Sequence, residues 1–203
     1  MAPTKTTRRP VDKFDARRDQ LAESALKTLG DLGYARTTLR EIANNSTFSH
    51  GVVHYYFANK IELITYCVRY YKATCVTRYD DLVATAATAE ELATGFADKL
   101  VETITDEAPM HRLWYDLRTQ SMFEPELREA VLEIDHTLEL MIWRIVLRYA
   151  ELSGGEPAFS SATTYAIFDG LFEKGLLSYL AGDPVALDDL RARALTVAES
   201  IVR

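Results

Sequence analysis

Cysteine is scarce in this sequence: only Cys67 and Cys75 occur among the 203 residues. The two lie eight positions apart on a segment with helical periodicity, which separates their Cα atoms by about 12 Å at about 1.5 Å per residue. A disulfide requires Cα atoms closer than about 7 Å, so the pair cannot bridge within the chain. Two reduced thiols favour a cytoplasmic protein over a secreted one that depends on disulfides.

Long apolar runs are also absent. The N-terminus has no apolar signal segment, and the most apolar stretch, "LELMIWRIVLRY" at 138–149, contains Arg144 and falls short of the roughly 20 residues that a membrane span needs. At 203 residues and 48% hydrophobic, the chain can still bury a core of ordinary size. We therefore expect a soluble, cytoplasmic protein without a membrane partner.

The usual signatures of catalysis and metal binding are missing as well. The sequence contains no Gly-rich phosphate loop, no H-E-x-x-H motif and no nucleophile elbow. His50 and His54 have the i, i+4 spacing of a zinc-binding helix, but position 51 is glycine and no third ligand is suggested nearby. The sequence therefore predicts neither an enzyme nor a metal or cofactor site.

Acidic residues are fewer than basic ones in the N-terminal part of the chain. The net charge is −7, yet residues 1–60 hold ten Lys and Arg against six Asp and Glu, whereas residues 61–203 hold 13 against 24. Small domains also differ in charge by chance. A basic N-terminal part followed by an acidic remainder nevertheless indicates that only the N-terminal part binds a polyanion.

Helical periodicity dominates the chain, and no alternating pattern of useful length indicates a strand. We predict an all-α fold of about nine helices. A flexible basic arm at 1–14 would precede a three-helix helix-turn-helix domain at 15–60 and a helical bundle at 61–203. Beyond residue 58, the predicted helices cover about 59–78, 88–106, 109–122, 124–152, 160–181 and 183–202.

Capping signals mark two short helices after a longer one. Thr38 and Glu41 form a T-x-x-E capping box, and Ser49 is a suitable N-cap for the next helix. Phe48 and Val53 have the spacing of a hydrophobic staple across that second start. Two short helices joined by a tight turn, behind a supporting helix, predict a helix-turn-helix.

The segment "SHGVVHYYF" at 49–57 is the candidate reading helix. Val53 and Phe57, four residues apart, share a face and are predicted to be structural. The remaining side chains of the segment are imidazoles, phenols and a valine. They are unusual on a helix face exposed to solvent, but they suit a groove of DNA. A glycine such as Gly51 lowers the stability of a helix by about 1 kcal/mol. This cost is understandable at a position where another backbone approaches closely.

The block "TTLREIANNSTFSHGVVHYYFANKIELI" at 37–64 resembles the DNA-binding domain of the TetR family of one-component transcriptional regulators. The likeness extends from about Asp15 to Leu63 without a gap. It implies a homodimer, usually a repressor, that releases a palindromic operator on binding a small molecule. By the family's pattern Thr38, Tyr56 and Lys60 contact phosphate, and His50, Gly51, Val52, His54 and Tyr55 lie along the major groove.

The turn departs from the family's pattern. Thr47 occupies the position that is commonly glycine, and Phe48 follows in place of a small aliphatic residue. A β-branched residue at positive φ is strained, so we expect a differently shaped turn.

The last two helices predict a dimer interface. The segment at 160–181 is apolar over more than one face, which indicates burial against a partner subunit as well as against its own core. TetR-type dimers use this last helix pair in a four-helix interface. A monomer that buries the helix centrally is the alternative. The predicted interface residues are Phe168, Phe172, Leu176, Leu190, Val197 and Ile201.

Aromatic side chains gather elsewhere in the C-terminal part and predict a small-molecule cavity. The segment "RLWYDLRTQSMFEPELREAV" is similar to the effector domain of the betaine-type branch of the family. A choline-like cation in an aromatic cage is one possible ligand, and an apolar or aromatic-compatible effector is the broader expectation. The predicted contacts are Tyr66, Tyr70, Phe96, Leu100, Trp114, Leu117, Phe123 and Met141.

The function predicted from the sequence is a ligand-released repressor that binds operator DNA as a homodimer. An activator, or a regulator without an effector, remains the alternative within the family. A structural helical adaptor would not need the basic arm or the reading helix.

Overall fold

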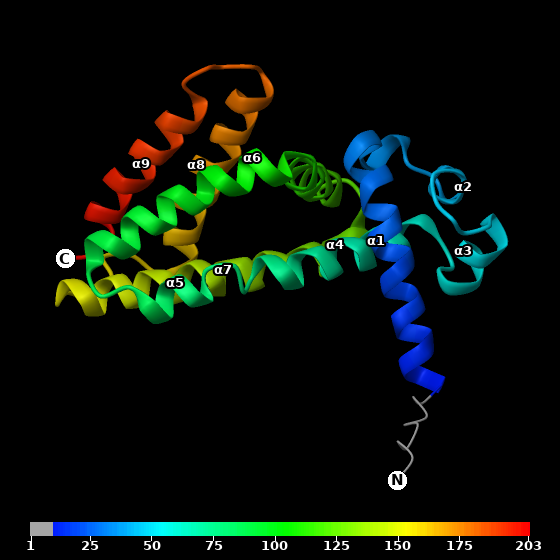
Figure 1. Ribbon diagram of the computed structural model, residues 1–203, viewed down its shortest axis with the longest axis horizontal. Helices are drawn as coiled ribbons and strands as arrows, with labels where there is room; N and C mark the ends of the chain where they lie inside the picture. Colours follow the sequence, from blue (N-terminus) through cyan, green and yellow to red (C-terminus); the bar gives the residue numbers. More distant parts are fainter. Residues whose placement is uncertain (1–9) are drawn as a thin grey trace, which may run out of the picture. The chain divides into compact units, whose positions relative to one another are not determined.

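The computed structural model describes residues 10–203, so positions 1–9 of the predicted arm lie outside the described residues. Over the described range the chain forms nine α-helices and one isolated β-bridge, which confirms the predicted all-α fold (Figure 1). The chain divides into two compact units: unit 1, which ends at Tyr71, and unit 2, Lys72–Arg203. The helices are α1 (Pro10–Arg36), α2 (Leu39–Asn44), α3 (His50–Tyr56), α4 (Lys60–Cys75), α5 (Asp80–Thr85), α6 (Ala89–Ser121), α7 (Pro125–Ser153), α8 (Ser161–Leu180) and α9 (Ala186–Ser200).

Helix α1 supplies much of the core of unit 1. It begins at Pro10, earlier than predicted, so residues 10–14 of the expected arm are helical. Leu21, Ala25 and Leu29 are buried on one face. Gly33, at φ 74° and ψ 176°, interrupts the helical backbone with a conformation that favours glycine.

The predicted caps of α2 and α3 are confirmed. The Thr38 hydroxyl accepts from the backbone N–H of Glu41 at 3.2 Å, and the Glu41 carboxylate accepts from the Thr38 N–H at 2.9 Å. The Ser49 hydroxyl accepts from the N–H of Val52 at 3.3 Å. These bonds satisfy backbone donors that a helix start otherwise leaves without partners, and they fix where each short helix begins.

The turn between α2 and α3 carries none of the strain expected of Thr47. No non-glycine residue in the described range has a positive φ. Ser46 closes the turn instead, because its hydroxyl donates to the carbonyl of Ala43 at 3.2 Å and accepts from the N–H of Phe48 at 3.1 Å. Thr47 therefore lacks the positive φ that was expected, and the predicted strain is wrong.

Helix α4 starts as predicted and ends early. The Asn59 side chain accepts from the N–H of Glu62 at 2.8 Å, and the helix closes at Cys75. The short helix α5 follows and was not predicted. Arg144 of α7 donates to the carbonyl of Val76 at 2.6 Å and to the carboxylate of Asp80 at 2.8 Å, so distant contacts stabilise this stretch.

The two helices predicted at 88–106 and 109–122 are one kinked helix, α6. Its backbone leaves helical geometry at Glu107, at φ −130° and ψ 22°, and resumes through Pro109. Proline has no N–H to donate and its ring clashes with the preceding turn, which explains a kink at this point. The predicted boundary between two helices is therefore a kink within one helix.

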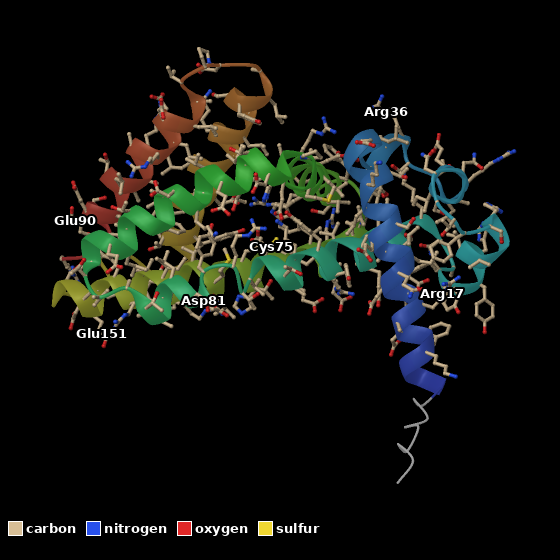
Figure 2. All side chains as sticks on the ribbon, viewed as in Figure 1. Arg17, Arg36, Cys75, Asp81, Glu90 and Glu151 are labelled. Carbon is tan, nitrogen blue, oxygen red and sulfur yellow. The ribbon has the colours of Figure 1, made fainter. Side chains whose placement is uncertain are left out.

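Unit 2 is a helical bundle. Helix α6 packs against α7 and α9, and α8 packs against α7 and α9, so the four helices close around a common core. Charged side chains such as Asp81, Glu90 and Glu151 project from the helix surfaces, whereas Cys75 is buried (Figure 2). No helix within residues 10–203 is both long and apolar enough to cross a membrane. One stripe of apolar side chains along α7 is buried throughout: Leu127, Val131, Ile134, Leu138, Met141 and Ile145.

Candidate functional site

Helix α3 has one buried and one exposed face. Val53 and Phe57 are each 0% exposed, as the sequence predicted, and they anchor the helix in unit 1. Tyr55 on the opposite side is 73% exposed. His50 and His54 are also exposed, with ring centroids 4.4 Å apart. Among the described residues, no group of three or more His, Cys, Asp and Glu could hold a metal ion.

The eight residues predicted to contact DNA all belong to unit 1 and define the recognition surface. A Cβ added at Gly51 would meet nothing within 4 Å, so packing inside unit 1 does not require glycine there. The expected close approach of an external backbone at Gly51 stays a prediction. Thr38, His50, Gly51, His54 and Tyr55 are exposed, and Val52, Tyr56 and Lys60 are partly exposed.

An aromatic cluster supports the C-terminal end of α3. Phe14 of α1 lies 4.9 Å from the Tyr56 ring and 6.3 Å from the Tyr55 ring, measured between centroids. Tyr55 and Tyr56 are themselves 4.9 Å apart and nearly perpendicular. Sequence reasoning missed Phe14, whose only signal was an isolated aromatic residue at the basic start of the chain. The contacts hold two predicted DNA-contacting side chains in place.

Arg18 of α1 contacts Phe57, which follows α3, and residues of α4. Its guanidinium lies 4.6 Å from the Phe57 ring centre and 4.4 Å from that of Tyr66, and it pairs with Glu62 at 2.8 Å. Tyr66 donates to Asp19 at 2.6 Å, and burial together with this carboxylate raises the pKa of Tyr66 to about 12. Tyr66 therefore stabilises unit 1 and does not serve the predicted cavity.

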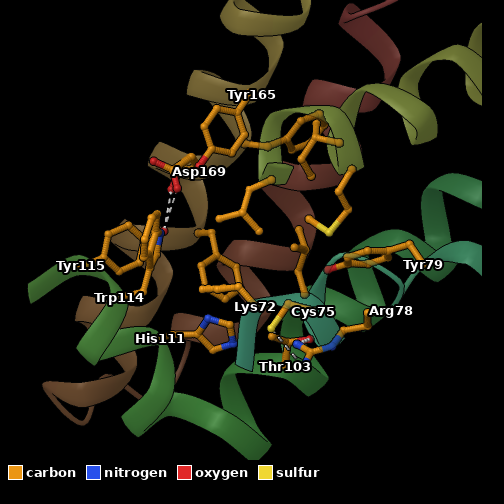
Figure 3. A pocket seen from close by; sticks show the side chains of 16 residues that line it. Lys72, Cys75, Arg78, Tyr79, Thr103, His111, Trp114, Tyr115, Tyr165 and Asp169 are labelled. Atoms are coloured by element: carbon orange, nitrogen blue, oxygen red, sulfur yellow. Dashed lines mark hydrogen bonds between the residues drawn. The ribbon is translucent and has the colours of Figure 1, made fainter. Parts of the chain in front are cut away.

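Unit 2 contains a cavity of about 70 Å³ bounded by the end of α4 and by α6, α7 and α8 (Figure 3). Leu100, Trp114 and Met141 line it, as predicted. Phe96 lies behind the lining, with its ring 5.3 Å from Tyr79 and 5.1 Å from Phe168.

Four predicted contacts lie elsewhere. Leu117 is buried but does not line the cavity. Tyr66 and Tyr70 belong to unit 1, and Tyr70 is 39% exposed. Phe123 is 78% exposed in the turn after α6, because the helix ends before this residue can turn inward.

Polar side chains, which the aromatic pattern did not reveal, make up part of the cavity wall. Tyr115 donates to the Asp169 carboxylate at 3.1 Å, and Arg118 donates to its other oxygen at 2.5 Å. Arg78 donates to Thr103 at 2.8 Å and also pairs with Glu107. The polar lining residues include Lys72, Arg78, Thr103, His111, Tyr115, Tyr165 and Asp169.

Lys72 and His111 are the two most unusual members of this wall, because they are only 4% and 5% exposed. Burial is the largest cause that lowers the pKa of Lys72. Burial, followed by the charges of Lys72 and Arg78, lowers the pKa of His111 to about 2. The Glu107 carboxylate lies 3.9 Å from His111 but pairs with Arg78, so it does not offset these effects. His111 is neutral in the folded protein at neutral pH.

This burial predicts a pH-dependent stability. The unfolded imidazole takes up a proton below about pH 6.5 and the folded one does not, so the unfolded state binds more protons as the pH falls. The associated stability is complete above about pH 6.5 and is lost below it. Between pH 7 and pH 5, native protein should lose about 2 kcal/mol more than the His111→Gln variant. Urea unfolding at both pH values measures this, and equal losses would contradict it.

Comparison with known proteins finds a family match in the N-terminal part of the chain. The profile described as "Bacterial regulatory proteins, tetR family" matches residues 21–67, which include α2, α3 and the first half of α4. A transcriptional regulator named BetI from Burkholderia mallei is 28% identical over 178 residues, covering 84% of this chain and 86% of its own length. Residues 21–67 therefore match the TetR family, and the chain resembles a transcriptional regulator over most of its length.

Solved structures share the fold of this chain. FadR from Bacillus subtilis, in complex with stearoyl-CoA, has a TM-score of 0.71 at 19% identity and covers 91% of this chain and 98% of its own. A protein from Saccharomonospora viridis, in complex with choline, has a TM-score of 0.69 at 20% identity and covers 93% of this chain and 99% of its own. At these identities the likeness establishes the fold alone.

The interface residues predicted for a TetR-type dimer mostly face the interior of the bundle. Phe168, Leu176, Leu190 and Ile201 are buried in the single subunit, and Phe172 lines the cavity. Val197 is partly exposed. Helix α8 turns its stripe of aromatic and leucine side chains toward the core, so a contact with a partner would have to use another face. That face carries Leu177 and Leu180, which are 62% and 46% exposed.

Proposed function

We propose that this TetR-family regulator is a homodimeric repressor that binds a palindromic operator and releases it on binding a small-molecule effector. The observation that carries the proposal is the exposed face of α3, fixed by Val53 and Phe57 beneath it and by the Ser49 cap at its start. A helix held this rigidly can enter the major groove without reorganising. DNA binding also implies a cytoplasmic location.

The recognition surface offers two kinds of contact. His50, Val52 and Tyr55 supply hydrogen-bonding and apolar groups suited to base edges. Lys60, whose ammonium lies 4.1 Å from the Tyr34 ring centre, and the exposed Thr38 suit phosphates at the margin. The first set would specify sequence, and the second would set orientation and general affinity.

Alanine variants should separate these two roles. Replacing His50, Val52 or Tyr55 should each cost about 1–3 kcal/mol of operator binding and relax the preference at one position of each half-site. Lys60→Ala should weaken all sequences to a similar degree and reduce the salt slope by about one unit. Fluorescence anisotropy on the protein's own upstream DNA and on random duplex, at several salt concentrations, measures both effects. Equal losses on the two DNAs for the α3 variants would reject the proposal.

The cavity of unit 2 is the proposed effector site. Helix α4 supports a connection between this site and DNA binding, because one helix carries Lys60 at its start and Lys72 and Cys75 near its end. A ligand that favours one position of α4 would change the match between two subunits and half-sites about 34 Å apart. Linkage then requires the operator to weaken effector binding by the same factor. FadR was solved with stearoyl-CoA and the Saccharomonospora protein with choline, so fold similarity does not specify the ligand.

A further inference from the structure

We propose that the effector cavity binds a small organic anion, a single carboxylate on a compact apolar body, rather than a cation. This inference rests on the proposed role of the cavity as an effector site and names the ligand class. Its first support is the convergence of Lys72, Arg78 and His111, nitrogen-bearing side chains from different elements, on one cavity (Figure 3).

The only carboxylate among the described residues that line the cavity is already engaged. Asp169 accepts from Arg118 at 2.5 Å and from Tyr115 at 3.1 Å. Because Arg118 neutralises it, Asp169 offers little attraction to a second cation. The lining therefore presents more hydrogen-bond donors than acceptors to a ligand.

Trp114 supplies an independent indication. It lines the cavity and is 2% exposed, and its indole nitrogen has no hydrogen-bond partner in the part of the chain that the structure describes. The indole N–H is a donor only, and leaving it buried without an acceptor is unfavourable. A carboxylate has acceptors only, so it provides the missing partner.

The same ring argues against an aromatic cage for a cation. The Lys72 ammonium lies 5.2 Å from the Trp114 ring centre, and the Arg118 guanidinium lies 5.9 Å from it. Two positive groups therefore already lie near the π-system that a quaternary ammonium would require.

Electrostatics inside the cavity favour the same ligand. The charge of Arg78 adds to burial in lowering the pKa of Lys72, whereas Cys75, Asp169 and Glu107 oppose it. The charges of Lys72 and Arg78 likewise act on His111. A bound carboxylate would oppose these effects, because its negative charge favours the protonated forms of Lys72 and His111.

The rest of the cavity limits the ligand's body. Leu138, Met141, Ile142 and Phe168 form an apolar wall. The volume of about 70 Å³ is smaller than the roughly 150 Å³ of an engineered cavity that holds benzene. Propionate is small enough to enter without rearrangement of the lining. Benzoate is larger and tests whether the apolar side chains can move apart.

Isothermal titration of the DNA-free protein with matched probes tests the inference. Propionate and benzoate form one set, propionamide and benzamide are their neutral counterparts, and choline is the cation. We expect at least one carboxylate to bind at least 10-fold more tightly than its amide, and choline not to bind. Binding of choline, or of an amide as tightly as its acid, would overturn the proposal.

Two variants place the anion at the cavity. Lys72→Met and Trp114→Phe should each weaken carboxylate binding at least 10-fold while thermal unfolding still shows a cooperative transition. Lys72→Met should not lower the unfolding midpoint, because it removes a buried charge. Lys99→Met is the matched control, since this lysine pairs with Glu102 on the surface of α6, and its carboxylate affinity should be unchanged. Wild-type affinity in both cavity variants would overturn the assignment.

A separate operator-release assay distinguishes this inference from the proposed function. If choline binds and releases operator DNA, the regulator proposal stands and the anion proposal fails. If carboxylates bind but the protein shows no preference for any DNA, the ligand assignment stands and the regulator proposal fails.

Discussion

Leu177→Glu is expected to convert the protein into a folded monomer whose operator affinity is lower by about 10²–10⁴-fold. Leu177 is 62% exposed on α8, so the substitution leaves the interior of the bundle intact. In the proposed dimer it would bury an unpaired charge against the partner, which is costly. A monomer reads a single half-site and loses the gain in effective concentration that a linked second subunit provides.

The neighbouring residue supplies a matched control. Leu176 is 3% exposed and faces the core, so Leu176→Glu should unfold unit 2 rather than dissociate intact subunits. Sedimentation velocity and circular dichroism separate these outcomes. A Leu177→Glu protein that stays dimeric would contradict the assignment of this face, and a monomeric native protein would contradict the dimer itself.

Asp169→Ala is expected to destabilise the protein by about 3 kcal/mol. The Asp169 side chain is 13% exposed and receives hydrogen bonds from Arg118 and Tyr115, which ties α8 to α6. Removing it leaves a largely buried guanidinium whose remaining ion-pair partner, among the described residues, is Asp135 at 3.6 Å. Removing one partner of a buried ion pair costs more free energy of folding than the intact pair contributes.

A surface ion pair offers the comparison. Asp98 pairs with Arg191 at 2.5 Å between α6 and α9, but the two side chains are 55% and 41% exposed. Asp98→Ala should therefore cost less than about 1 kcal/mol. Urea unfolding followed by far-UV circular dichroism measures both variants. Losses of the same size would show that Asp169 has no special structural role.

Features set by neighbouring residues could be predicted from the sequence. The Thr38 and Glu41 box and the Ser49 cap involve atoms three residues apart, so their hydrogen bonds depend on local geometry alone. The inward faces of Val53 and Phe57 followed from helical periodicity for the same reason. The recognition surface was accessible to sequence reasoning because it occupies one short helix and its margins.

Features set by distant packing could not be predicted. Lys72 and His111 read as ordinary surface residues, and only the closure of α6, α7 and α8 around them makes them part of a cavity wall. The orientation of α8 shows the same limit. Its apolar residues cover more than one face, so periodicity alone could not decide that Leu176 faces the core while Leu177 faces outward.

Selection of bound sequences from a random duplex library tests the central claim most directly, because the library contains candidate operators of every sequence. Native protein should enrich a two-fold symmetric motif with half-sites spaced by about one helical turn or a multiple of it. The Tyr55→Ala variant should lose preference at the same position in both halves. Recovery of sequences with no common motif, at affinities equal to that of random DNA, would contradict the account.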